Sequence, residues 1–293
     1  MMGFGVYQSL FDVFLLNCGL AFSQFIVLRA GVFSIASAAY AAIGGYATAI
    51  LVTKHGVPAP VAIAISTLLG ILVSAALSVP LARLRGVYQA IATLAFVEIV
   101  VSLGFYAEDF TGGAMGINGI PKLVGTGTLC LALAVVLYVM VAIDRSGLGR
   151  AFDTVRQDET VAASLGISVQ RSHAIAFVIS GAIGGLFGGL QSLYVYSIEP
   201  QQFGFALLVS MLAAIVLGGR GSVIGPVVGT AILTALPELA RPLAENRPLI
   251  HGLLLILIIN YLPHGVADSL LLWRRRRRAA RALAAHLQAD HAL

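Results

Sequence analysis

Long runs of apolar residues alternate with short polar joins along most of this chain. An α-helix needs about 20 apolar residues to cross the hydrocarbon core of a bilayer. By that measure the pattern predicts an all-α, polytopic integral membrane protein with about nine transmembrane helices, within a range of eight to ten. The expected spans are residues 6–28, 31–53, 58–80, 86–106, 126–143, 172–195, 204–219, 222–240 and 248–263.

Residues 204–240 allow two readings, either two crossings or one re-entrant hairpin. In a hairpin, Arg220 would lie near the middle of the membrane, at a cost of at least ~2.5 kcal/mol. Two crossings joined by a tight turn at GGRGS are therefore preferred.

The composition supports the same class of protein. Of the 293 residues, 59% are hydrophobic and only 11% are charged, whereas soluble domains carry about 25% charged residues. We expect one transmembrane domain over residues 1–270 and a basic tail over 271–293. The net charge of +5 comes largely from Arg274 to Arg278 in that tail. Arginine beside a membrane segment sets orientation or contacts anionic lipid, so nucleic acid is not an expected partner.

One polar segment, Ser146 to Arg171, interrupts the apolar runs. Its sequence predicts a helix over about 147–166, with Ser146 as N-cap and Gly166 at the end. The apolar face carries Leu148, Phe152, Val155, Ala162 and Leu165, with Glu159 at the same spacing. Such a helix is either a connector on the membrane surface or a docking helix for a soluble partner.

Positive charge predicts the orientation of the chain, because cytoplasmic loops collect Lys and Arg. If the polar segment is cytoplasmic, alternation of the spans places fourteen of the eighteen basic residues on that side, with the N-terminus outside and the C-terminus inside. The four on the other side are Lys54, Lys122, Arg241 and Arg247.

Two series of glycines recur at four-residue spacing and predict close helix packing in the membrane. They are Gly181, Gly185 and Gly189 in one span, and Gly221, Gly225 and Gly229 in a later one. A functional version of this prediction is that the two faces slide during transport.

Polar residues inside expected spans are candidates for the translocation path or a subunit interface. Glu98 lies deep in its span and could line a path, pair with another subunit or stay protonated. Asn17 and Gln24 are candidates of the same kind, with interhelical hydrogen bonding favoured. Asp12 lies near the outer end of its span and is expected to reach water. Cys18 and Cys130 are expected to be buried packing residues.

The expected outer loop, from Glu108 to Gly127, contains TGGAMGINGIPK and is rich in turn residues. We expect this loop either to connect two spans or to receive a partner. Its candidate docking residues are Thr111, Gly112, Gly113, Gly116, Asn118 and Pro121.

Motifs for chemistry are missing from the sequence. Neither Lys54 nor Lys122 lies in a phosphate-binding G-x-x-x-x-G-K-[ST] loop, so the chain lacks that route to ATP hydrolysis. The histidines and cysteines are scattered, which argues against a metal site. We expect no enzymatic activity, no cofactor and no metal.

Six ordered blocks of the sequence resemble the permease subunits of branched-chain amino-acid ABC importers, of the LivM type within the LivH/LivM permeases. They are RLRGVYQAIATLAFVEI, TGGAMGINGIP, GRAFDTVRQDETVAASLGI, AFVISGAIGGLFGGL, EPQQFGF and VLGGRGSVIGPVVG. The resemblance implies a bacterial inner-membrane subunit. It also implies two ATP-binding cassette ATPase subunits, a second homologous permease and a periplasmic substrate-binding protein as partners.

The resemblance further implies that the polar segment is the coupling helix that contacts an ATPase subunit. The residues expected to carry coupling are Arg150, Phe152, Arg156, Glu159 and Gly166, with Phe152 anchoring the interface. The expected cargo is a branched-chain amino acid or a related small solute. The alternatives are a ribose-type sugar permease, a proton-coupled secondary transporter that uses Glu98, and a lipid-interacting scaffold.

Overall fold

The computed structural model describes residues 2–81, 83–239 and 265–269, and the contacts divide the chain into two units, Met1–Leu212 and Ala213–Leu293. Helices make up most of the described structure, and six of the described helices are long and apolar enough to cross a membrane. The expectation of an all-α, multi-pass membrane protein is therefore confirmed. The basic tail 271–293 and the expected span 248–263 lie outside the described residues.

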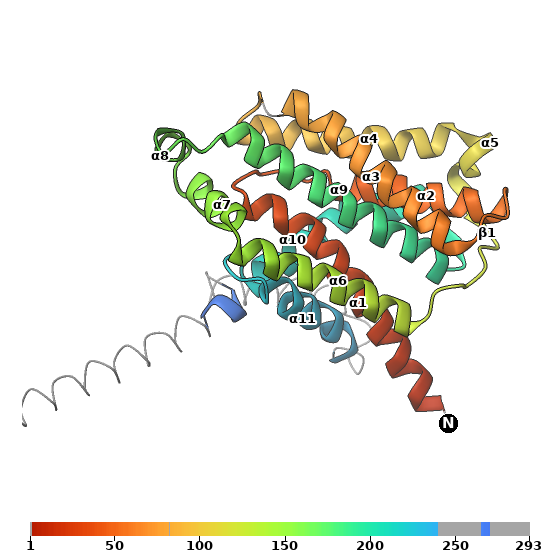
Figure 1. Cartoon of the computed structure of the whole chain (residues 1–293). Coiled ribbons are helices and arrows are strands. Elements are labelled where there is room, and N and C mark those ends of the chain that lie inside the picture. The colour runs from red at the N-terminus through yellow and green to blue at the C-terminus, as the bar shows by residue number, and fades with distance from the viewer. Residues whose placement is uncertain (1, 82, 240–264, 270–293) are drawn as a thin grey trace, which may run out of the picture. The chain divides into compact units, whose positions relative to one another are not determined.

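The first unit contains several short elements and six helices of 17 residues or more, drawn in Figure 1. Five of these six are among the membrane-length helices, and α2 is not. The long helices are α1 (Met2–Arg29), α2 (Ser37–Thr53), α3 (Ala59–Leu81), α4 (Val87–Tyr106), α6 (Thr126–Arg145) and α9 (Val169–Tyr194). The short elements are α5 (Glu108–Thr111), η1 (Gly113–Met115), β1 (Ile117–Asn118), α7 (Gly147–Gln157), α8 (Glu159–Ser164), β2 (Ser197–Ile198) and η2 (Pro200–Phe203). Helix α10 (Phe205–Gly218) runs across the boundary between the units.

The second expected span is shorter than its apolar run. Helix α2 has 17 residues, about 26 Å at 1.5 Å per residue, so it falls short of the ~30 Å hydrocarbon core. The first residues of the run 31–53 are not helical: α1 ends at Arg29, the chain turns at Gly31 with φ +84°, and the connection continues to Ala36 before α2 begins. Helix α11 (Gly225–Leu239) also falls short, with 15 residues. The count of nine crossings stays a prediction.

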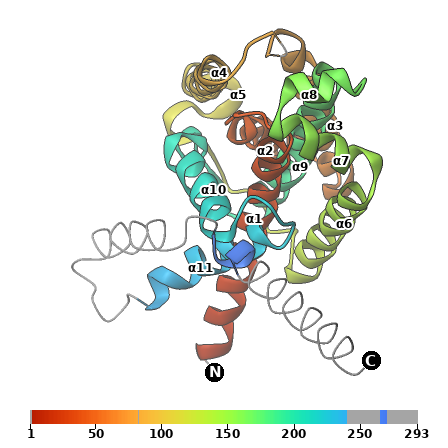
Figure 2. The same cartoon turned by 90° about the vertical axis from the view of Figure 1, so that its left-hand side faces the viewer.

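Helix α9 lies at the centre of the first unit and contacts α1, α2 and α3 (Figure 2). Two rows of glycines allow this close approach. A methyl group on Gly185 would lie 2.6 Å from the carbonyl oxygen of Ser66 in α3, and one on Gly188 would lie 2.7 Å from Cα of Ala41 in α2. Side chains at these positions would push the helices apart, so glycine is required for this packing.

Helix α3 meets α9 with small residues spaced four apart. Ala62, Ser66, Gly70, Ser74 and Ser78 are all buried along this stripe. Three of the stripe's serines donate to carbonyls one turn back in their own helix, at 2.7–3.0 Å. Their hydroxyl groups are therefore satisfied inside an apolar contact, as a low-dielectric interior requires.

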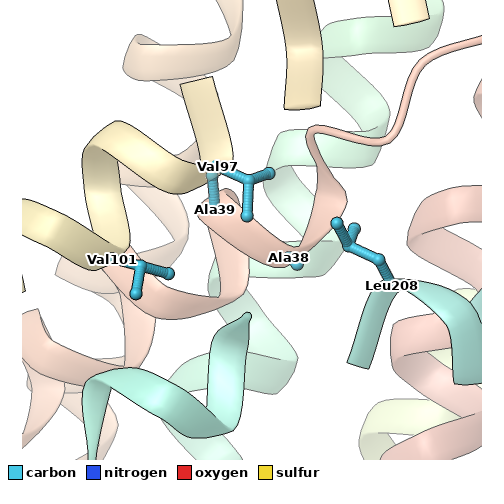
Figure 3. Packing of buried hydrophobic residues seen from close by; sticks show 5 residues of the cluster. All are labelled: Ala38, Ala39, Val97, Val101 and Leu208. Atoms are coloured by element: carbon cyan, nitrogen blue, oxygen red, sulfur yellow. The ribbon is translucent and has the colours of Figure 1, made fainter. Parts of the chain in front are cut away.

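A small apolar cluster joins three helices of this unit (Figure 3). Ala38 and Ala39 of α2 pack with Val97 and Val101 of α4 and with Leu208 of α10. The cluster holds the beginning of α2 against the otherwise peripheral α4.

In the second unit, the first member of the later glycine series lies outside a helix. Gly221 precedes α11 and its N–H donates to Oδ2 of Asp268 at 2.7 Å. The prediction of one helix face for Gly221, Gly225 and Gly229 is therefore wrong for Gly221, because the chain turns at Gly219, where φ is +105°. Gly225 packs against the carbonyl of Gly219, and Gly229 against that of Ala214. The choice between two crossings and a hairpin stays a prediction.

Candidate coupling site

The polar segment forms two helices rather than the single helix expected from its periodicity. Helix α7 begins at the predicted N-cap, where the side chain of Ser146 accepts from the N–H of Leu148 at 3.2 Å. The helix ends at Gln157, and Asp158 adopts an extended conformation before α8 begins. The spacing of apolar residues did not reveal this break, because both helices continue nearly the same pattern.

Asp158 causes the break by capping α8. Its Oδ1 accepts from the N–H of Thr160 at 2.8 Å and of Val161 at 3.2 Å, and also from the Thr160 hydroxyl. The Thr160 hydroxyl, followed by the two backbone donors, lowers the pKa of this exposed carboxyl. A lowered pKa means that the cap is fully formed above the carboxyl's ordinary pKa and is lost as the pH falls through the lowered value.

The inner face of α7 packs into the first unit. Phe152 is completely buried, and Gly149 and Val155 are buried beside it. The prediction that Phe152 anchors an ATPase subunit is therefore revised, because a buried side chain holds α7 to its own chain and offers no surface to a partner. Gly149 lies so close to the end of α6 that a methyl group there would be 2.8 Å from the carbonyl oxygen of Asp144.

The outer face of the two helices remains exposed. Arg150 is exposed, together with Gly166, where φ of +78° ends α8. The apolar residues Leu148, Val161 and Leu165 are also exposed, at 39%, 51% and 68%. Leu148 and Leu165 belong to the apolar face that the sequence predicts, yet both are exposed. For Leu165 the reason is that α8 begins anew after the extended Asp158 and does not continue the buried face of α7. We call the exposed set Leu148, Arg150, Val161, Leu165 and Gly166 the coupling surface.

Ion pairs connect both helices to the rest of the unit. Arg29 at the end of α1 pairs with Asp144 of α6 and, at 3.6 Å, with Asp153 of α7. Glu159 of α8 pairs with Arg85 at 3.6 Å, and Arg156 pairs with Asp153 at 3.6 Å. Arg29, Asp144 and Asp153 were not among the site residues predicted from the sequence. The only signal in the sequence was that Arg29 and Asp144 lie at the ends of apolar runs, and that Asp153 lies inside the polar segment.

The outer loop lies at the opposite end of the first unit from α7 and α8 (Figure 1). Its strand β1 pairs with β2 in a two-residue antiparallel ladder, with Ile117 opposite Ile198. At Gly116, φ is +64° and a methyl group would collide with the carbonyl of Ile198. Lys54 donates to the carbonyls of Asp109 and Phe110 at 2.6 and 3.1 Å. The loop is therefore a fixed structure.

The predicted docking residues of this loop fall into two groups. Thr111, Gly113 and Gly116 are buried, and the Thr111 hydroxyl donates to the carbonyl of Gly104 at 2.6 Å. Gly112, Asn118 and Pro121 are exposed and can meet a partner.

The polar residues expected in the translocation path are not brought together. Glu98 and Asn17 are exposed, on α4 and α1. Gln24 is buried and bridges α1 to the start of α2, donating to the Ser34 carbonyl and accepting from the Ser37 hydroxyl. This contact is the interhelical hydrogen bonding that the sequence favoured.

Two expectations about burial are wrong. Asp12 does not reach water: it is 4% exposed, and its Oδ1 has no hydrogen-bond partner among the described residues. Cys130 is exposed on α6, although Cys18 is buried as expected. In the part of the chain that the structure describes, no group of three or more His, Cys, Asp or Glu is placed to hold a metal ion.

The family described as "Branched-chain amino acid transport system / permease component" matches residues 13–260. The chain belongs to this permease family. Family membership confirms the resemblance drawn from the six sequence blocks. No solved structure matches this permease.

Permease proteins of several bacteria are similar to this chain. The permease is 32% identical over 259 residues to the high-affinity branched-chain amino acid transport system permease protein LivM of Escherichia coli (strain K12), a match that covers 77% of this chain and 61% of LivM. LivH of Salmonella typhimurium is 32% identical over 132 residues, 44% of this chain and 42% of LivH. The autoinducer 2 import system permease protein LsrC of Enterobacter sp. (strain 638) is 30% identical over 159 residues, 48% of this chain and 46% of LsrC.

Proposed function

We propose that this chain is the membrane-spanning permease subunit of an ATP-driven ABC importer of branched-chain amino acids or a chemically related small solute. Membership of the permease family carries the proposal, since the named relatives LivM and LivH are permeases of a branched-chain amino acid transport system. The similarity to LsrC supports keeping related solutes in the proposal. The same matches favour a permease over a proton-coupled carrier or a lipid-binding scaffold.

The coupling surface is the proposed contact for an ATPase subunit. It projects from the end of the first unit that carries Arg85, Arg145 and Arg150, which is typical of a cytoplasmic surface. Its exposed leucines and valine would be covered by the partner, and Arg150 would pair with an acidic side chain there. Two such ATPase subunits supply ATP hydrolysis, and the permease itself is not an enzyme.

The outer loop is the proposed docking site of a periplasmic substrate-binding protein. The loop lies at the other end of the unit and is held in one shape by the β1–β2 ladder. A fixed loop loses little conformational entropy on binding. In this orientation the N-terminus is outside, the C-terminus is cytoplasmic, and the membrane is the bacterial inner membrane.

The exposed face of α4 is the proposed contact with a second permease subunit. Glu98 lies on this face among Ile91, Ile99 and Leu103, which are all more than half exposed. A carboxylate facing lipid is costly, so a protein partner accounts for it better than lipid does.

The proposal is tested by reversing the charge of Arg150 in the complete importer. Reconstituted with its ATPase subunits, partner permease and binding protein, the wild-type complex is expected to take up radiolabelled leucine only with ATP. Arg150→Glu is expected to insert normally and to lose ATPase binding by about tenfold, because the pair across the interface becomes repulsive. Arg150→Lys keeps the charge and serves as the control. Wild-type binding and uptake by Arg150→Glu would refute the assigned surface.

A further inference from the structure

Arg29, the last residue of α1, is almost completely buried although it carries a permanent charge. It is 4% exposed, and its Nη2 pairs with carboxylates of Asp144 and Asp153. A buried charge is stable only when it is well paired. The two carboxylates come from different helices, since Asp144 lies in the last turn of α6 and Asp153 lies within α7. Arg29 therefore ties three helices together at one point.

The charges around Arg29 suit the helix ends that meet there. The C-terminus of a helix carries a partial negative charge, and a cation in its last turn is favourable. Arg29 occupies that position in α1. Asp144 places a negative charge at the same end of α6, where it would be unfavourable without a cation beside it. Removing Arg29 would leave two carboxylates facing two negative helix ends.

Backbone contacts fix α7 to the same elements. Gly149 packs against the end of α6, where a methyl group would be 3.0 Å from Cα of Asp144. Gly31, just after α1, approaches α7 so closely that a methyl group would be 3.0 Å from Cα of Arg156. Helix α7 is thus held to both α1 and α6 by contacts that leave little room for independent motion.

Helix α1 passes this connection inward to other helices. Gln24, little more than one turn before Arg29, holds the carbonyl of Ser34 and the hydroxyl of Ser37 at the start of α2. The N–H of Ile35 in the same connection donates to the hydroxyl of Thr93 in α4 at 3.1 Å. A displacement of the end of α1 is therefore shared with α2 and α4 through direct hydrogen bonds.

Helix α8 is connected differently. Its ion pair is Glu159 with Arg85, at 3.6 Å, and the Arg85 side chain is 82% exposed. Exposed ion pairs contribute little because water screens them. The extended Asp158 separates α8 from α7. Of the two helices of the polar segment, only α7 takes part in the ion pairs of the buried Arg29.

We propose that Arg29 is the positioning residue that makes α1, α6 and α7 move as one body, so that a push on α7 from the ATPase subunit reaches α2 and α4. This inference rests on the proposed function and assigns the route of coupling within it. The role of Arg29 in this proposal is confined to the conversion of ATP hydrolysis into transport.

The test is the number of leucine molecules transported per ATP hydrolysed by the complete importer in proteoliposomes. Arg29→Gln is expected to insert, to bind the ATPase subunits and to hydrolyse ATP, with leucine transported per ATP falling about tenfold. Arg29→Lys keeps a cation without the planar fork and is expected to retain an intermediate ratio. Arg145→Gln, an exposed arginine of the same type at the end of α6, is the matched control and is expected to keep the wild-type ratio.

A milder variant keeps the inference testable if Arg29→Gln fails to insert. Asp153→Asn removes the carboxylate of α7 and leaves Arg29 paired with Asp144, and we expect the same direction of loss. Combining Asp153→Asn with Arg29→Gln should add little further loss, because both act through one contact. Combining Arg85→Gln with Arg29→Gln should be additive.

The outcomes separate this inference from the proposed function. A wild-type complex without ATP-dependent uptake would refute the proposed function, and the inference would fall with it. A wild-type complex that couples normally, with an unchanged ratio in an inserted Arg29→Gln or, failing insertion, in Asp153→Asn, would refute only the role of Arg29. Loss of ATPase binding in Asp153→Asn would also refute it, because the contact would then support the docking surface itself.

Discussion

Helices α9 and α6, of 26 and 20 residues, are both strongly apolar, but they occupy opposite environments. Mean hydropathy is 1.7 in the apolar window of α9 and 2.4 in that of α6, yet 67% of the first window is buried inside the protein and only 22% of the second. The more apolar helix is the more exposed one. In a membrane, an apolar side chain is as stable in contact with lipid as in contact with protein. Mean hydropathy therefore does not predict which helix is buried.

What distinguishes the two helices is the distribution of small residues. Helix α9 carries glycines on two faces, which meet α2 and α3 at backbone distance. Helix α6 has leucine, valine and tyrosine on its exposed side, and only Leu129, Leu133, Val136 and Met140 are buried. Van der Waals contact between backbones therefore holds α9 in place, whereas α6 is held by a single stripe of larger side chains.

The largest effect is expected from adding one methyl group to α9. Gly188→Ala would place a carbon 2.7 Å from Cα of Ala41, which forces α2 and α9 apart. We expect the free energy of unfolding to fall by about 3 kcal/mol, measured by unfolding of the purified subunit in mixed detergent micelles. Gly127→Ala in α6 is the matched control, since no atom lies within 4 Å of that position. Equal losses in both variants would remove the distinction between the helices.

The next prediction compares two amide residues of α1. Gln24→Leu removes the bridge to Ser34 and Ser37 and leaves their buried polar groups without it, so a loss of about 2 kcal/mol is expected in the same assay. Asn17→Leu, on an exposed position of the same helix, is expected to change stability little. A larger loss of unfolding free energy in Asn17→Leu than in Gln24→Leu would contradict this prediction.

A third prediction concerns the exposed face of α4, which differs from that of α6 by carrying Glu98. Glu98→Leu should leave the stability of the isolated subunit unchanged or slightly improved, while weakening association with the second permease by about 1 kcal/mol. Fluorescence energy transfer between labelled subunits measures that association. Unchanged pairing would mean that α4 faces lipid, as α6 does.

The smallest effect is expected on the exposed side of α6. Leu131→Ala, at a position that is 69% exposed, should change the unfolding free energy by no more than about 0.5 kcal/mol. Leu193→Ala in α9, where the side chain is fully buried, should cost about 3 kcal/mol through the cavity it leaves. Similar costs at the two leucines would contradict the assignment of α6 to the periphery.

The sequence was sufficient for the class of fold and for the elements that depend on local pattern. Apolar run length located the long helices, and Ser146 was identified as an N-cap because that role depends on one side chain and its neighbouring N–H groups. Glycine spacing pointed to α9 as a packing helix. The β1–β2 ladder was missed because it pairs Ile117 with Ile198, far apart along the chain.

The candidate site was predicted less completely, for a physical reason. Helical periodicity identifies a stripe of apolar residues but not which turns of that stripe are buried. Phe152 and Leu165 therefore lie on the same predicted stripe, and periodicity does not distinguish their burial. Their burial differs because α7 packs on the unit and α8 begins anew after Asp158. The ion pairs of Arg29 could not be predicted from local sequence, because its two carboxylate partners lie more than a hundred residues away along the chain.

Helix α9 also has a consequence for how binding at the two ends of the first unit is related. It begins just after α8, and it ends just before β2, which pairs with the outer loop. If binding at either end shifts α9, the two binding events share one free energy of interaction. Thermodynamic reciprocity then requires that a ligand on the outer loop change the affinity of the α8 end by the same factor as a ligand at α8 changes the affinity of the outer loop. Measuring one of these factors would therefore fix the other.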